Sequence, residues 1–154
     1  MNVEFINPFL SSMLNVMSTM AQMELTPEKP KLKKGEVAYG DVSGLIGMVS
    51  AQTKGSLSIT FDASLALAVM QNMFGESPAE INDEITDLVG EITNMVTGGA
   101  KRLLSEKGFE FDMATPMVVS GTKHTITHKA KGPVVIIPLS SAAGGKAYIE
   151  FSFD

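Results

Sequence analysis

Apolar side chains recur every three to four positions over residues 2–23 and again between Asn82 and Gly108, and this spacing predicts two long amphipathic helices. Asn82 is a good N-cap and Gly108 a good stop for the second helix, which should be about 38 Å long at about 1.5 Å per residue. A shorter helix is expected from the N-cap Asp62 to about Phe74. The pattern thus places a short helix between two long ones.

Other apolar segments alternate with polar residues or end at glycines, and these are expected to be strands. They comprise residues 36–51, 56–61, 114–120, 122–129, 133–139 and 146–153. The proline- and lysine-rich stretch 26–35 is expected to be a solvated loop. Because a long helix and its strands occur twice, the order indicates a duplicated unit. We expect one domain over residues 1–154: an α/β (α+β) sandwich with two long helices on one mixed, mainly antiparallel sheet and internal pseudo-two-fold duplication.

The polar side of the second long helix carries a regular stripe. Asp87, Glu91, Asn94 and Gly98 lie at i, i+4, i+7 and i+11 and therefore share one face. Gly90 lies on the same side, and a glycine inside a helix costs about 1 kcal/mol relative to alanine. A solvated helix face is the simplest alternative, but it has no need for this cost. A face that another protein's backbone approaches closely does need small residues.

The first long helix is the candidate counterpart of the second. Laying one over the other places Ser12 on Glu91 and Asn15 on Asn94. The first helix then has Ser-x-x-Asn where the second has Glu-x-x-Asn. On this alignment only the second helix carries the complete pair.

Composition narrows the function classes. The chain has 154 residues, a net charge of −5 and no cysteine, so disulfides are excluded and the reducing cytoplasm is the expected compartment. An acidic surface disfavours non-specific binding to nucleic acid or anionic membranes. Its apolar runs are far shorter than the about 20 residues needed to span a bilayer, so no membrane insertion is expected.

Other candidate sites are weaker. His124 and His128 share one face of the expected strand but lack nearby carboxylates or cysteines, so they are expected to lie on a surface strand and to bind no metal. The lysines of the 26–35 loop are flanked by Glu28 and Glu36 and are expected to be solvated. No nucleophile–base pair accompanies Glu91 and Asn94, so these two residues do not form a self-contained hydrolase.

The motif Asp87-x-x-x-Glu91-x-x-Asn94-x-x-x-Gly98 on a long helix resembles the CheC/CheX/FliY family, phosphatases of the chemotaxis response regulator CheY. The stretch 5–9 (Phe-Ile-Asn-Pro-Phe), the turn 54–56 (Lys-Gly-Ser) and the phenylalanine-rich last strand extend the resemblance to nearly the whole chain. Family members of the CheX type keep the Glu-x-x-Asn pair on one helix, and Ser12 in place of a glutamate favours this type. The resemblance also implies a homodimer.

The resemblance implies that the chain hydrolyses the aspartyl phosphate of a phosphorylated CheY-type response regulator. Asn94 would orient the attacking water, and Glu91 would pair with a lysine of the receiver domain. Asp87, Gly90 and Gly98 would contact the partner, which would also supply Mg²⁺, so no cofactor of the chain's own is expected. Two alternatives remain: a receiver-binding module without catalysis, and a flagellar-switch scaffold.

Overall fold

The structure, a computed structural model, describes residues 3–154. These residues form three helices, α1 (Val3–Met20), α2 (Ala63–Phe74) and α3 (Asp83–Glu106). They also form eight strands: β1 (Leu25–Pro27), β2 (Lys31–Leu32), β3 (Val42–Val49), β4 (Lys54–Phe61), β5 (Asp112–Met113), β6 (Met117–Ser120), β7 (Val135–Ser141) and β8 (Lys146–Phe153). Within this part of the chain, no helix combines the length and apolarity needed to cross a membrane.

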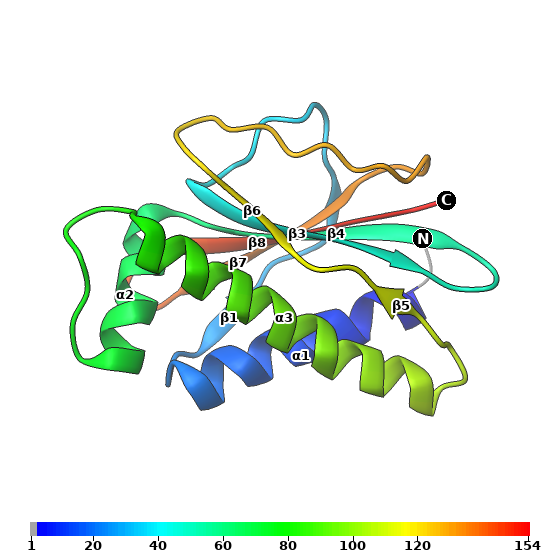
Figure 1. The fold of residues 1–154 in the computed structure, drawn as a ribbon, viewed down its shortest axis with the longest axis horizontal. Coiled ribbons are helices and arrows are strands. Elements are labelled where there is room, and N and C mark those ends of the chain that lie inside the picture. The colour runs from blue at the N-terminus through cyan, green and yellow to red at the C-terminus, as the bar shows by residue number, and fades with distance from the viewer. Residues whose placement is uncertain (1–2) are drawn as a thin grey trace.

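All eight strands belong to one sheet with the order β1–β7–β8–β4–β3–β5; β2 also pairs with β7, and β6 with β3. Every pairing between named strands of the described chain is antiparallel. The sheet was expected to be mixed but mainly antiparallel, and the expectation that some strands pair in parallel is wrong. The long helices α1 and α3 lie side by side on one face of the sheet, and two irregular segments cover the other face (Figure 1). The predicted two-layer sandwich is confirmed.

The sheet order reveals the duplication. One unit contains α1 and β1–β4, the other contains α3 and β5–β8, and α2 connects them. The short strands β1 and β2 pair with the hairpin of the second unit, while β5 and β6 pair with the hairpin of the first. The central strands β4 and β8 pair antiparallel with Ser58 opposite Glu150 at the middle. This arrangement has the predicted pseudo-two-fold symmetry.

The helix boundaries follow the predicted caps. The side chain of Asp62 accepts a hydrogen bond from the backbone nitrogen of Leu65 at 2.8 Å, and that of Asn82 accepts one from Ile85 at 3.2 Å. Gly75 follows α2 with a φ of 80°, a left-handed conformation that glycine adopts without strain. The apolar stripes of the helices pack on the apolar face of the sheet, where Phe9, Phe61 and Phe151 are fully buried.

Three expectations about strands are wrong. Residues 122–129 form no strand and contribute a single bridge, between Val37 and Thr125. Residues 36–41 also lie outside β3, because both segments leave the sheet and bond to each other, as in the 2.7 Å bond from the nitrogen of Ile126 to the oxygen of Glu36. The supposed loop 26–35 contributes to β1 and to all of β2, whose partner β7 lies far along the chain and leaves no local pattern.

The burial pattern corrects the alignment of the two long helices by one residue. Ser12 is buried, whereas Glu91 is exposed, so these two residues are not equivalent. Six buried positions on each helix match at a shift of 80 residues. They are Pro8, Phe9, Ser12, Met13, Val16 and Met17 on α1, and Leu88, Val89, Ile92, Thr93, Val96 and Thr97 on α3. Ser11 and Leu14 therefore occupy the positions of Glu91 and Asn94, and α1 carries neither residue of the pair.

Candidate functional site

The predicted polar stripe lies on the outer surface of α3. Asp87, Glu91, Asn94 and Gly98 are exposed. Most of the residues between them are buried against the sheet and α1. The stripe begins about one turn after the N-cap and continues along rigid, regular helix. One helix of one chain therefore carries the carboxylates, the amide and the open glycine in a fixed relation to each other.

The polar side chains of this stripe are unengaged. Within residues 3–154, no hydrogen bond or ion pair involves the side chains of Asp87, Glu91 or Asn94; the backbone oxygen of Asn94 accepts a bond from Thr97 Oγ1 at 3.1 Å. Glu91 and Asn94 are one helical turn apart and project in similar directions. A partner can therefore meet both groups without first breaking a contact inside this chain.

The glycines of α3 have different roles. A β-carbon on Gly98 would meet nothing within 4 Å, whereas one on Gly90 would lie 3.4 Å from Cγ2 of Val118 in β6. Gly99 faces α1, where a β-carbon would overlap the hydroxyl of Ser12. Packing within the chain thus explains why residue 99 is a glycine, and it is part of the reason at residue 90. Only Gly98 keeps open space on the outer face for a partner's backbone.

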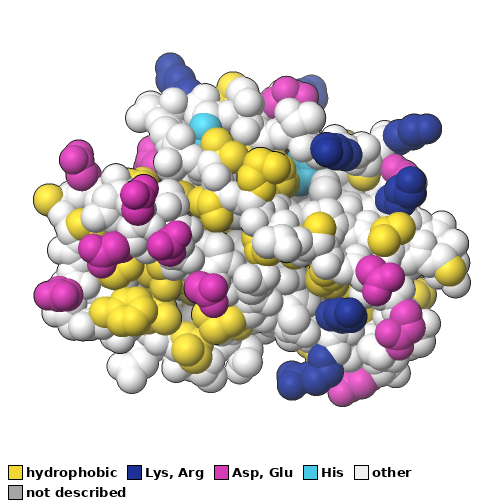
Figure 2. Space-filling model, viewed as in Figure 1, with side chains coloured by type: hydrophobic (Ala, Val, Ile, Leu, Met, Phe, Trp, Pro, Cys, Tyr) yellow, Lys and Arg dark blue, Asp and Glu magenta, His cyan; other side chains and the backbone are white. Residues whose placement is uncertain are grey.

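The surroundings of the stripe are strongly acidic. Between Gly55 and Ala100 the chain has seven carboxylates and no lysine or arginine. A group of acidic side chains without basic neighbours lies over α2 and the beginning of α3, whereas most basic side chains on this face lie toward the other end, among further acidic ones (Figure 2). Such a one-sided distribution attracts a partner with a basic surface and accelerates its approach.

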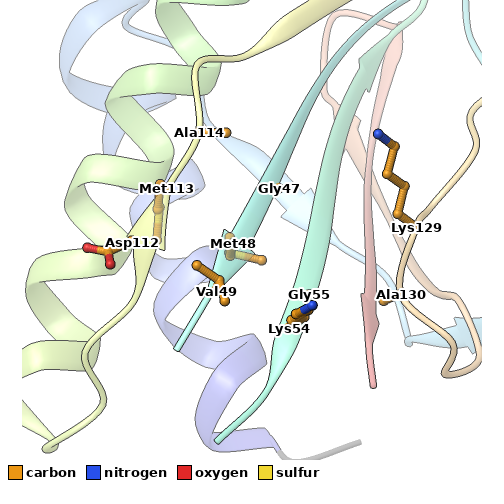
Figure 3. A pocket seen from close by; sticks show the side chains of 10 residues that line it. All are labelled: Gly47, Met48, Val49, Lys54, Gly55, Asp112, Met113, Ala114, Lys129 and Ala130. Carbon is orange, nitrogen blue, oxygen red and sulfur yellow. The ribbon is translucent and has the colours of Figure 1, made fainter. Parts of the chain in front are cut away.

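The site is not a pocket. A cavity of about 440 Å³ lies beside the ends of β3 and β4, where Gly47, Val49, Lys54 and Met113 are among its lining residues (Figure 3). Neither this cavity nor four further ones among the described residues is lined by Asp87, Glu91, Asn94 or Gly98. Residues 3–154 also hold no cluster of three or more potential metal ligands. An exposed helix face outside these cavities is suited to contact with another protein rather than to enclosing a small ligand.

The other face of the sheet holds a buried polar network that the sequence did not reveal. Glu150 is fully buried and pairs with Lys33 Nζ at 2.9 Å and with His128 Nε2 at 3.1 Å. Nδ1 of His128 bonds to the hydroxyl of Ser56 at 2.5 Å. His124 similarly bonds to the hydroxyl of Ser43 at 2.7 Å.

The network corrects two expectations. His124 and His128 do not lie on a surface strand, and Lys33 is buried rather than solvated. The one signal in the sequence was Glu150, a charge within an otherwise apolar and aromatic strand. A buried carboxylate needs a partner, but nothing local indicates that the partners are Lys33 and His128.

The sequence and the fold both have counterparts among known proteins. The family model for the chemotaxis phosphatase CheX matches residues 42–140. A comparison with curated protein sequences gives no match. Among solved structures, a CheC-like superfamily protein from Shewanella sp. PV-4 is 66% identical, with a TM-score of 0.93 and coverage of 100% of this chain and 99% of that one.

Two further structures extend the comparison. The chemotaxis protein CheX from Vibrio vulnificus is 65% identical over 98% of this chain and 99% of that one, with a TM-score of 0.91. CheX from Borrelia burgdorferi, solved as a CheX–CheY–BeF3–Mg²⁺ complex, is 26% identical over 99% of both chains, with a TM-score of 0.81. Because the family match covers more than half of the chain and two relatives are similar over nearly its full length, this chain belongs to the CheX family, within the wider CheC/CheX/FliY group.

Proposed function

We propose that this chain accelerates hydrolysis of the aspartyl phosphate on a phosphorylated CheY-type response regulator. The observation that carries the proposal is the exposed and unengaged pair Glu91 and Asn94, held one turn apart on a long helix. Membership of a family described as chemotaxis phosphatases supports it. The relative from Borrelia burgdorferi assembles with CheY, which supports a receiver of the same kind as the partner here.

In this proposal Asn94 enters the receiver's active site and orients the attacking water. A carboxamide is not a base at neutral pH, but its oxygen accepts and its nitrogen donates a hydrogen bond. Water attacks phosphorus in line with the acyl oxygen, the bond from phosphorus to that oxygen breaks, and the products are phosphate and the free aspartate. Phosphoryl transfer depends mainly on positioning and charge stabilisation, so a single oriented amide is a sufficient contribution.

Glu91 has a different role. Its carboxylate pairs with a lysine of the receiver and fixes the register of α3 on the partner. Asp87 and Gly98, on the same exposed face, contact the partner beside this pair. Gly90 is half-buried and contributes close packing at the edge of the contact. Mg²⁺ belongs to the receiver in this mechanism, and the phosphoryl group and the metal arrive together with the partner.

The decisive experiment compares the decay of a phosphorylated CheY-type receiver in Mg²⁺ buffer with and without this chain. Faster decay, at a rate that saturates with concentration, is the expected result. Binding of the phosphorylated receiver without faster decay would indicate a docking module. Binding to flagellar-switch components without any effect on the phosphoryl lifetime would indicate a scaffold.

We also propose that the chain forms a homodimer, as the family resemblance implies. Glu91 and Asn94 come from one helix of one chain, so a second copy adds no group to the proposed site. Phosphatase activity per chain should therefore stay constant on dilution through the dimer dissociation range. Light scattering and activity measured on the same dilution series test both statements.

A further inference from the structure

The two long helices meet closely at Ser12 and Gly99. Ser12 is 5% exposed, and its hydroxyl donates a hydrogen bond to the backbone oxygen of Val96 at 2.7 Å. Gly99 lies three residues further along α3, and a β-carbon there would overlap Oγ of Ser12. The absence of a side chain at Gly99 thus permits the present separation of α1 and α3, and Ser12 limits how much closer they can come.

The same part of α3 is held from a second side. Thr93 is fully buried, and a β-carbon on Gly44 of β3 would overlap Oγ1 of Thr93. Asn94 follows Thr93 directly and precedes Val96 by two residues. The turns that carry Asn94 are therefore fixed between the sheet and α1. Since protein interiors are close-packed, an added atom at either contact forces a neighbour to move: at Gly99, either the Ser12 hydroxyl gives up its bond to Val96 or the two helices separate.

We propose that Ser12 and Gly99 are positioning residues for the phosphatase reaction: their contact fixes the separation of α1 and α3, and thereby the place of Asn94 in the partner's active site. The inference rests on the proposed function. A group that orients water tolerates little displacement, because a shift of about 1 Å can cost about a hundredfold in rate. Neither residue touches the receiver, so the effect passes through α3.

The corrected alignment of the helices supports this role for Ser12. It is equivalent to the buried Ile92 rather than to Glu91, so it is not the remnant of a second Glu-x-x-Asn pair. A small residue is needed where the helices touch, and a hydroxyl at this position also bonds to the neighbouring helix. The residue is thus suited to setting the spacing between the helices.

A double-mutant cycle tests the inference on the full chain. Gly99→Ala should lower kcat for dephosphorylation about tenfold while KM changes less than about threefold, because binding is retained and alignment is lost. In Ser12→Ala/Gly99→Ala the overlapping hydroxyl is gone, and the new β-carbon lies 3.4 Å from that of residue 12. This variant should recover kcat to within about twofold of the wild type. Ser12→Ala alone loses the bond to Val96 and leaves space at the contact, so it should lower kcat by a smaller factor, about threefold.

Ser11→Ala is the matched control, since Ser11 is the exposed neighbour and no hydrogen bond of its side chain occurs among the described residues. Unchanged kcat in folded Gly99→Ala would overturn the inference, and so would a double variant that recovers nothing. If Gly99→Ala does not fold, Ser12→Cys enlarges the same contact by a smaller step, and unchanged kcat there would also overturn it. A wild-type protein that leaves receiver decay unchanged would instead remove the proposed function, and this inference with it.

Discussion

Lys33 and Glu150 form an ion pair of 2.9 Å in which both side chains are almost completely excluded from solvent. Removing one partner of a buried pair leaves an uncompensated charge, which costs about 3–5 kcal/mol. We therefore expect Glu150→Gln to lower the free energy of unfolding by several kcal/mol, measured by urea denaturation. The helix α3, which carries the proposed site, lies on the opposite side of the sheet (Figure 1), so kcat of the folded fraction should stay unchanged.

The exposed ion pair between Lys146 and Glu28 provides the control. Its nitrogen–oxygen distance is 3.2 Å, but the two side chains are 47% and 44% exposed. Solvent screens such a pair, and its loss usually costs less than about 1 kcal/mol. Glu28→Gln should therefore be nearly neutral. If Glu28→Gln and Glu150→Gln lowered the free energy of unfolding equally, the claim that burial makes the Lys33–Glu150 pair important would be contradicted.

Glu91→Gln should weaken binding of the phosphorylated receiver. The substitution keeps the shape of the side chain and removes the charge that we pair with a receiver lysine. The dissociation constant should rise about tenfold, since a charge-assisted hydrogen bond contributes about 1.5–3 kcal/mol. Affinity measured from low to moderate salt should fall less steeply for the variant than for the wild type. Glu106→Gln, at the far end of α3, is the control, and an equal effect there would indicate nonspecific attraction.

Tyr148 provides a prediction about pH. Burial raises the pKa of its phenol above the ordinary value of about 10, with smaller opposing and reinforcing contributions from nearby charges. Between the unfolded and the folded pKa, the unfolded chain binds fewer protons, so stability falls as pH rises. The contribution is fully present below pH about 10 and decreases above it. Absorbance near 295 nm should show one of the two tyrosines titrating late, and Tyr148→Phe should abolish that late phase.

The parts of the fold that could be predicted are those determined by local chemistry. The caps Asp62 and Asn82 and the periodicity of α3 gave the helices and the outward face of Glu91 and Asn94, because helix geometry relates neighbouring residues directly. The strands β4 and β8 alternate clearly and were found for the same reason. The face itself was thus predictable from spacing, while the roles of its residues remain predictions.

The parts that could not be predicted depend on contacts between distant segments. The strands β1 and β2 exist because β7 offers an edge, and Lys33 is buried because Glu150 lies beneath it. The one-residue error in aligning α1 with α3 has the same origin, since serine is compatible with either face of a helix. Ser12 is placed at the buried contact between α1 and α3 only by its bond to Val96 and its contact with Gly99.

The central claim is that Asn94 performs the chemistry by orienting water, and one measurement addresses it most directly. It is the single-turnover decay of a phosphorylated CheY-type receiver at saturating concentrations of wild-type protein and of Asn94→Ala, with complex formation measured in parallel. We predict that Asn94→Ala binds the receiver within about threefold of the wild type and loses about a hundredfold in the decay rate. An Asn94→Ala variant that binds and still accelerates decay like the wild type would contradict the claim.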